Sequence, residues 1–186
     1  MELWQIICLA AYCFIVAVLA IYGFHRYQLL RLFHRHHRDE IALPRPFVDL
    51  PLITVQLPLY NELHVTERLL EAVARLDYPR DRLQVQVLDD STDETCAHAQ
   101  QITERLAATG LDIKYLHRTH RTGFKAGALA AGLECATGEF VLVLDADFVP
   151  PTDLLHRVIH HFTDPAVGMV QTRWGHLNRD HSLLTR

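Results

Sequence analysis

The 186-residue sequence contains almost no lysine and no paired-cysteine motif. Lys114 and Lys125 are its only lysines, and all other strongly basic residues are arginines. None of the four cysteines belongs to a CxxC pair or to another metal-type spacing, so neither a disulfide framework nor a structural zinc site is expected. The formal net charge of −4 gives no sign of a nucleic-acid partner. Neither GxGxxG nor GxxxxGK[ST] occurs, which excludes a Rossmann fingerprint and a P-loop.

Charge is also absent from the run between Leu3 and Phe24. A helix of that length, at 1.5 Å per residue, spans about 33 Å and matches the roughly 30 Å hydrocarbon core of a bilayer. A cleavable signal peptide fits poorly, because no basic segment precedes the run and no A-x-A-like site follows it. We therefore expect residues 1–25 to form a retained transmembrane helix.

The segment after this run is basic. Residues 25–38 contain four arginines and four histidines but no acidic residue. The positive-inside rule then predicts that the following residues are cytoplasmic and that the short N-terminus lies outside, in a bacterial inner membrane or an equivalent one. Leucines between the arginines also allow the segment to lie on membrane lipids as an amphipathic helix. Residues 26–50 are expected to form a basic juxtamembrane segment and a proline-containing linker.

Beyond residue 50, strand patterns alternate with helical periodicity. Strands are expected at 52–58, 83–90, 111–117, 139–147 and 167–174, and helices at 64–76, 91–108, 123–136 and 151–162. Ser91 and Glu94 have the spacing of a capping box at the start of the second helix. The alternation predicts that residues 51–186 form an α/β domain with a doubly wound, mostly parallel sheet, which binds ligands beyond the carboxyl ends of its strands.

Four polar clusters fall at that edge of the predicted sheet. They read PLYNE (58–62), DDSTDE (89–94), RTGFKAG (121–127) and DAD (145–147). Each one alone has a structural explanation, such as a turn or a helix cap. Four of them at the carboxyl edge of one sheet indicate a binding site.

The chemistry of these clusters points to a nucleoside diphosphate with a metal ion. Carboxylate oxygens are the ligands that Mg²⁺ and Mn²⁺ prefer, and Asp147 follows the most apolar strand. Lys125 would add a point charge to a helix N-terminus, where backbone N–H groups and the helix dipole favour a phosphate. Asp89 and Asp90, one strand away, could accept hydrogen bonds from a base or a ribose.

Five motifs in this order resemble the processive family-2 glycosyltransferases, and most closely their cellulose-synthase-like branch, which includes mannan and glucan synthases. The motifs are VQLPLYNE, VQVLDDSTDET, RTGFKAGALAAGL, GEFVLVLDADFVPP and VQTRWGHLNRDHSLLT, and they cover roughly residues 50–186. The resemblance implies a GT-A fold, a UDP- or GDP-sugar as the sugar donor, Mg²⁺ or Mn²⁺, and inversion at the anomeric carbon of the transferred hexose. It also implies a growing β-glycan or a lipid-linked glycan as the acceptor.

The resemblance assigns roles to individual residues. It implies that Tyr60 and Glu62 line the nucleobase–ribose pocket and that Asp90 contacts the base. Lys125 would lie beside the diphosphate, and Asp145 would contact the sugar donor. The metal ion would be coordinated by the last acid of the DAD cluster.

The family pattern extends beyond this chain. Its catalytic base belongs to a Thr/Ser-Glu-Asp motif and its acceptor site to a Gln-x-x-Arg-Trp motif, and neither occurs before Arg186. We therefore expect the general base beyond Arg186, and we expect the chain to hold the half of the site that binds the sugar donor and to be inactive by itself. The alternative is a non-catalytic, truncated membrane protein that only binds a nucleotide sugar or a partner. A nucleotide-sugar pyrophosphorylase would need a glycine-rich signature near its first strand, where PLYNE stands.

Overall fold

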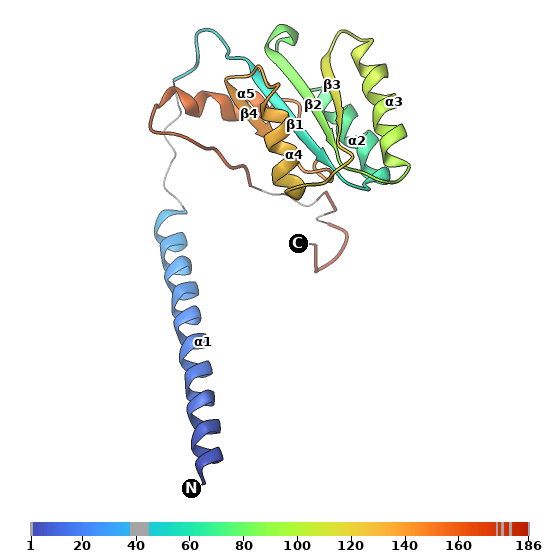
Figure 1. Cartoon of the computed structure of the whole chain (residues 1–186). Helices are drawn as coiled ribbons and strands as arrows, with labels where there is room; N and C mark the ends of the chain where they lie inside the picture. The colour runs from blue at the N-terminus through green and yellow to red at the C-terminus, as the bar shows by residue number, and fades with distance from the viewer. Residues whose placement is uncertain (1, 38–44, 174, 176, 179, 186) are drawn as a thin grey trace. The chain divides into compact units, whose positions relative to one another are not determined.

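The computed structural model describes residues 2–37, 45–173, 175, 177, 178 and 180–185, in two compact units that divide after residue 43. The first unit is the helix α1 (Leu3–His36) (Figure 1). None of its side chains is buried. This helix is long and apolar enough to cross a membrane. It continues past residue 25 without a break, so the basic segment as far as His36 belongs to the same helix. The orientation across a membrane stays a prediction.

The second unit is built on a sheet of four parallel strands in the order β3-β2-β1-β4 (Figure 1). The strands are β1 (Ile53–Leu59), β2 (Leu83–Asp89), β3 (Asp112–His117) and β4 (Phe140–Val143). Ile53 stands opposite both Leu83 and Phe140, which sets the register of β1 with β2 and β4. The α/β fold predicted from the alternating pattern is confirmed.

Helices cover both faces of the sheet. On one face lie α2 (Leu63–Ala74), α3 (Thr95–Ala107), α5 (Leu154–Val158) and the 3-10 helix η2 (Ile159–Thr163), whose apolar side chains share one core with the strands. On the other face lies α4 (Phe124–Leu133), seen in front of β1 in Figure 1. A short 3-10 helix, η1 (Arg80–Arg82), leads into β2.

The face under α2 and α3 is a conventional apolar core. Val55, Leu57 and Val85 are fully buried there and pack in one cluster with Leu70 and Ile102. Complete burial of one such side chain stabilises a fold by about 1.5–3 kcal/mol. Because successive strand residues point to opposite faces, this core uses every second residue of β1 and β2.

The face under α4 is polar, although it is equally buried. Gln56 and Gln86 are almost fully inaccessible, and the Gln56 side-chain amide donates to the Gln86 carbonyl at 3.0 Å. The same amide donates to the backbone carbonyl of Leu129 in α4 at 3.3 Å. Because a buried polar group is costly unless it is hydrogen-bonded, these bonds fix the distance between α4 and the sheet.

A second polar pair joins the sheet to the loop that follows α4. The Thr54 hydroxyl donates to the side-chain carbonyl of Gln84 at 2.8 Å. The side-chain amide of Gln84 donates to the backbone carbonyl of Cys135 at 3.3 Å. The Thr54 hydroxyl oxygen in turn accepts a hydrogen bond of 2.9 Å from the N–H of Gly138. The end of α4 and the start of β4 are thereby held against β1.

Several sequence-based boundaries change. Residues 167–173 form no strand, contrary to the prediction for 167–174, and Trp174 lies outside the described residues. The capping box does not form, because α3 begins only at Thr95 and the Ser91 hydroxyl accepts the Asn61 N–H instead. The expected linker also packs on the domain near its end, where the Phe47 N–H donates to Nδ1 of His160 at 3.1 Å.

We predict that Gly138→Ala destabilises the domain, whereas Gly168→Ala does not. A Cβ at Gly138 would stand 2.3 Å from the backbone nitrogen of Thr54, and backbone atoms of a central strand cannot yield. Overpacking of this kind costs about 1–3 kcal/mol or more. A Cβ at Gly168 would meet nothing within 4 Å. The check is the midpoint of chemical denaturation, followed by tryptophan fluorescence or circular dichroism.

Neither glycine has a positive φ, so both substitutions restrict the unfolded chain alike, and the difference between them isolates the clash. Equal midpoints for the two variants would contradict the close approach of the α4–β4 loop to β1.

Candidate functional site

The loops that follow β1 and β2 hold each other in place. The N–H of Asn61 donates to the Ser91 hydroxyl at 2.8 Å, and the side chain of Asn61 accepts the Thr92 N–H at 2.9 Å. The N–H of Asp90 donates to the Leu59 carbonyl at 3.0 Å. Asn61 has a φ of 55°, a left-handed conformation that asparagine tolerates better than most residues. The first two polar clusters therefore form one rigid rim.

The third cluster folds tightly into the start of α4. Gly123 and Phe124 are both left-handed, with φ values of 72° and 51°. A Cβ at Gly127 would stand 2.0 Å from the carbonyl oxygen of Thr122, so this position requires glycine. The turn places Lys125 in the first helical turn, at the carboxyl edge of the sheet. Phe124 is a bulky residue at positive φ, and such a conformation is strained and persists only where surrounding contacts enforce it.

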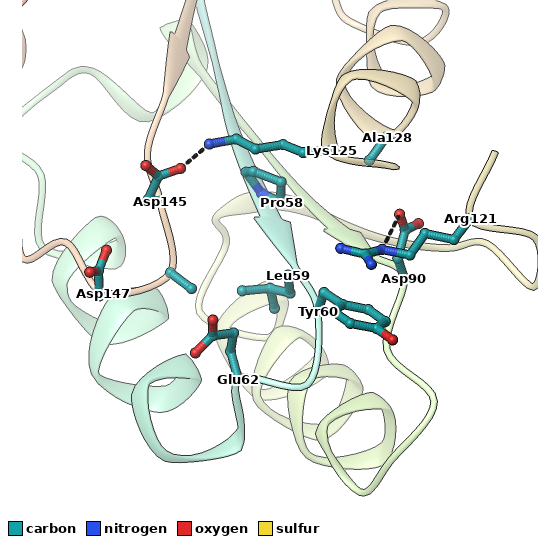
Figure 2. A pocket seen from close by; sticks show the side chains of 11 residues that line it. Pro58, Leu59, Tyr60, Glu62, Asp90, Arg121, Lys125, Ala128, Asp145 and Asp147 are labelled. Atoms are coloured by element: carbon teal, nitrogen blue, oxygen red, sulfur yellow. Dashed lines mark hydrogen bonds and ion pairs between the residues drawn. The ribbon is translucent and has the colours of Figure 1, made fainter. Parts of the chain in front are cut away.

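The four clusters meet around one cavity of about 340 Å³ (Figure 2). Its lining residues are Pro58, Leu59, Tyr60, Glu62, Asp90, Arg121, Lys125, Ala128, Asp145, Ala146 and Asp147. The cavity is within the range of small-molecule sites, roughly 300–1,000 Å³. All of the predicted site residues except Asp89 line it.

Asp89 lies elsewhere, because it is adjacent to Asp90 and so faces the opposite side of the sheet. Its carboxylate is fully buried and accepts the N–H of Ser91 at 2.9 Å and the hydroxyl of Tyr115 at 2.6 Å. Burial, followed by the hydrogen bond to Asp89, raises the pKa of Tyr115, which keeps its proton and remains a donor. Asp89 anchors the turn after β2 from beneath.

A thiol and an imidazole lie beside Asp89. The ligand atoms of Asp89, Cys96 and His117 are all within 4.8 Å of one another. Burial and the neighbouring Asp89 carboxylate raise the pKa of Cys96, whose protonated thiol donates to the Ser91 carbonyl at 3.0 Å. Since both Asp89 oxygens and the thiol already have partners, this group is held together by hydrogen bonds.

Two arginines that the sequence reasoning did not single out complete the site. Arg118 donates two hydrogen bonds to the Asp90 carboxylate, of 2.7 and 2.6 Å. The guanidinium carbon of Arg121 lies 3.4 Å from the centroid of the Tyr60 ring, and its Nε is 3.9 Å from the Asp90 carboxylate (Figure 2). Arg118 directly follows β3, and that position at the carboxyl edge was a signal that could have found it.

The opposite wall of the cavity carries an ion pair and the carboxylate of Asp147. On this wall, Lys125 donates to Asp145 (Figure 2). Both side chains are about half exposed, at 50% and 44%. Among the residues that the structure describes, none is hydrogen-bonded to or paired with the exposed carboxylate of Asp147. One wall therefore holds a cation and two acids, and the other holds an aromatic ring and a fixed carboxylate.

A model of the family described as Glycosyl transferase family 2 matches residues 54–182 of this chain. That range includes the whole sheet except Ile53, the first residue of β1, and every side chain that lines the cavity. The chain belongs to glycosyl transferase family 2. The resemblance of its five motifs to this family is thus confirmed.

A curated relative carries the same likeness. Over 143 residues the chain is 44% identical to a probable glucomannan 4-beta-mannosyltransferase 7 of Oryza sativa subsp. japonica. The match covers 74% of this chain and 24% of the relative, so the chain spans about a quarter of that protein's length.

Solved structures of the same kind share the fold. A mannosyltransferase of Pyrobaculum calidifontis, in complex with GDP-Man and Mn²⁺, is 35% identical with a TM-score of 0.66, covering 81% of this chain and 44% of that one. S. aureus TarS 1-349, in complex with UDP, is 26% identical with a TM-score of 0.53, covering 67% of this chain and 39% of that one. The family-2 chain therefore has a glycosyltransferase fold of the predicted GT-A type.

We predict that Lys125→Gln leaves the stability of this family-2 domain nearly unchanged. An exposed ion pair contributes about 1 kcal/mol or less, because solvent screens it. Asp90→Ala is the comparison, since loss of one partner of a buried pair costs about 3–5 kcal/mol. Urea denaturation of the two variants provides the check. A loss for Lys125→Gln as large as that for Asp90→Ala would mean that the lysine serves the fold and not a ligand.

Proposed function

We propose that this chain carries the part of a membrane-anchored glycosyltransferase that binds the sugar donor. The reaction is the metal-dependent transfer of a hexose, with inversion, from a UDP- or GDP-sugar to a growing β-glycan or a similar acceptor. The main support is that six side chains from four separate loops line one cavity: Tyr60, Glu62, Asp90, Lys125, Asp145 and Asp147. Bringing charged side chains from separate loops to one place lowers the stability of the fold, and binding of a shared ligand explains why they are placed there.

The base and ribose would occupy the wall formed by the first two loops. Tyr60, a residue that is 38% exposed, offers an aromatic ring, and the Asp90 carboxylate at its side can accept hydrogen bonds from N–H groups of the base. Glu62 lies on the same loop and lines the cavity (Figure 2), and its carboxylate would accept a hydrogen bond from a ribose hydroxyl. An aromatic face beside a fixed acceptor suits a nucleobase of either kind.

The diphosphate would lie at the start of α4. Lys125 contributes a point charge, and the N-terminus of α4 contributes backbone N–H groups and the positive end of the helix dipole. Lys125 also pairs with Asp145. Binding would exchange partners: the ammonium would move to the phosphates, and the Asp145 carboxylate would be freed for the sugar or the metal.

The residues present fit a divalent metal. Asp145 and Asp147 present carboxylate oxygens at the lip of the cavity, and hard cations such as Mg²⁺ and Mn²⁺ bind through one or two carboxylates together with substrate phosphates. Asp147 would hold the ion, because it lines the cavity with an exposed carboxylate on the same side as Asp145 (Figure 2). When bound, the ion would neutralise the charge that develops on the leaving nucleoside diphosphate.

Asp89 would serve the sugar donor only indirectly. Its bonds to Ser91 and Tyr115 fix the turn from which the Asp90 carboxylate enters the cavity. The general base that takes the proton from the acceptor hydroxyl is expected beyond Arg186, as the family pattern implies. The transfer of the sugar to the acceptor is therefore proposed for the whole protein and not for this chain by itself.

A guanosine or a uridine nucleotide is compatible with this cavity. The mannosyltransferase that resembles the chain at a TM-score of 0.66 is in complex with GDP-Man, which supports a GDP-sugar. The more distant TarS is in complex with UDP. The alternative, a membrane protein that only binds the nucleotide sugar, differs in one observable: the whole protein would bind the sugar donor without transferring the sugar.

We predict that Asp147→Asn abolishes the Mn²⁺-dependent part of nucleotide binding. The test measures the affinity of the 186-residue chain, in detergent, for GDP and for UDP with Mn²⁺ and with a chelator. Wild-type protein should bind one nucleotide about tenfold or more tightly with Mn²⁺, a difference of about 1.4 kcal/mol or more. The variant should bind it equally with and without the ion.

Asp81→Asn is the matched control, because Asp81 is an exposed aspartate of η1 outside the cavity. The metal role of Asp147 is wrong if its variant keeps the full Mn²⁺ effect. Failure of wild-type protein to bind either nucleotide would contradict the proposed function itself.

A further inference from the structure

Arg118 is placed by the end of β3 but does not line the cavity. Its backbone N–H donates to the Asp89 carbonyl at 3.0 Å, which extends the ladder between β2 and β3 by one step. Asp89 stands opposite His117, so Asp90 and Arg118 occupy the next pair of positions and share a face of the sheet. Their side chains therefore meet just behind the wall of the cavity.

Arg118 contacts Asp90 through a bidentate pair of hydrogen bonds that is largely buried. Nε of Arg118 donates to one carboxylate oxygen at 2.7 Å, and Nη2 donates to the other at 2.6 Å. The two side chains are 21% and 3% exposed. Bidentate pairs of this kind fix the plane of a carboxylate as well as its charge. The orientation in which Asp90 faces the cavity is set by Arg118.

The same guanidinium also holds the loop before α4. Nη1 donates to the carbonyl of Thr122 at 3.2 Å, and Nη2 donates to the carbonyl of Phe124 at 3.1 Å. A Cβ at Gly127 would stand 3.0 Å from Nη1, so the arginine packs directly under the first turn of the helix. These contacts brace the two left-handed residues that precede Lys125.

We propose that Arg118 is a positioning residue that couples recognition of the base to binding of the diphosphate. One rigid guanidinium joins the Asp90 carboxylate, which would contact the base, to the turn that presents Lys125 to the phosphates. This inference rests on the proposed function. Arg118 itself touches neither part of the nucleotide, and it acts by keeping both contact groups in register.

Lysine cannot take over this role. An ammonium is a point charge without the planar fork, and it cannot bind both carboxylate oxygens and two backbone carbonyls in fixed directions. Arg118→Lys therefore keeps the charge beside Asp90 and removes the geometry. A residue that supplied only charge would tolerate this substitution.

The experiment compares two binding measurements on the 186-residue chain in detergent, both with Mn²⁺. The first is the ratio of its affinities for GDP and UDP, which reports recognition of the base. The second is competition by pyrophosphate, which reports the diphosphate end alone. Arg118→Lys should lower the GDP/UDP discrimination and the pyrophosphate affinity together, each by about tenfold.

Arg105→Lys is the matched control. Arg105 also pairs with two carboxylates, Glu67 and Glu71, but on the exposed surface of α2 and α3. This variant should keep both readouts at wild-type values. A loss of stability alone would reduce the folded fraction of the Arg118 variant without changing the discrimination shown by its folded molecules.

The outcomes separate the inference from the proposed function. A folded Arg118→Lys variant that keeps either the discrimination or the pyrophosphate affinity overturns the coupling. Wild-type protein that binds neither nucleotide overturns the proposed function instead.

A second measurement tests the coupling if Arg118→Lys does not fold. Asp90→Asn leaves the arginine in place and weakens its anchor, so hydrogen exchange of the amides at 123–127 should quicken. Unchanged exchange in that segment would overturn the coupling whether or not a nucleotide binds.

Discussion

The parallel pairing of β1 with β2 and β4 is the constraint on which the site depends. It aligns Ile53 with Leu83 and Phe140, and so brings the carboxyl ends of strands that are far apart in the chain to one edge. Tyr60, Asp90 and Asp145 emerge from three of these ends. Since parallel strands require a crossover between each pair, the helices that follow these strands begin at this edge, near the cavity, and end at the opposite edge of the sheet.

A buried polar layer gives this arrangement its rigidity on the α4 side. Gln56 and Gln86 hydrogen-bond to each other, and Gln56 also bonds to the Leu129 carbonyl of α4. An apolar interface would let the helix slide, whereas these directional bonds define one position along its axis. The position of α4 determines where Lys125 stands relative to Asp145, and Arg118 ties the first turn of the same helix to Asp90.

The sequence predicts the fold and most of the cavity because both follow from local patterns. Apolar runs ending in acids located the strand ends, and the motif order supplied the family. Asp89 was predicted to bind the sugar donor although alternation turns it away from Asp90, so a strict use of the period-two rule would have excluded it. The position of Arg118 directly after β3 was a signal for the carboxyl edge, but its pairing with Asp90 depends on the register between β2 and β3, which no local pattern reveals.

The failed strand at 167–174 has a related cause. Its apolar, β-branched residues fit a strand, but a strand forms only where a neighbour pairs with it, and residues 167–173 pair with none of the described strands. Val141 and Val143 of the edge strand β4 remain exposed, at 40% and 42%. Propensity alone could not decide this case, because pairing is a tertiary property.

The most direct test of this account is a crystal structure of the chain with GDP and Mn²⁺, in which anomalous scattering locates the metal. The account predicts a manganese peak bonded to the Asp147 carboxylate, the base against Tyr60 and the diphosphate beside Lys125. A nucleotide bound elsewhere, such as in the hollow beside Tyr115 and Cys135 on the far side of Arg118, would contradict it.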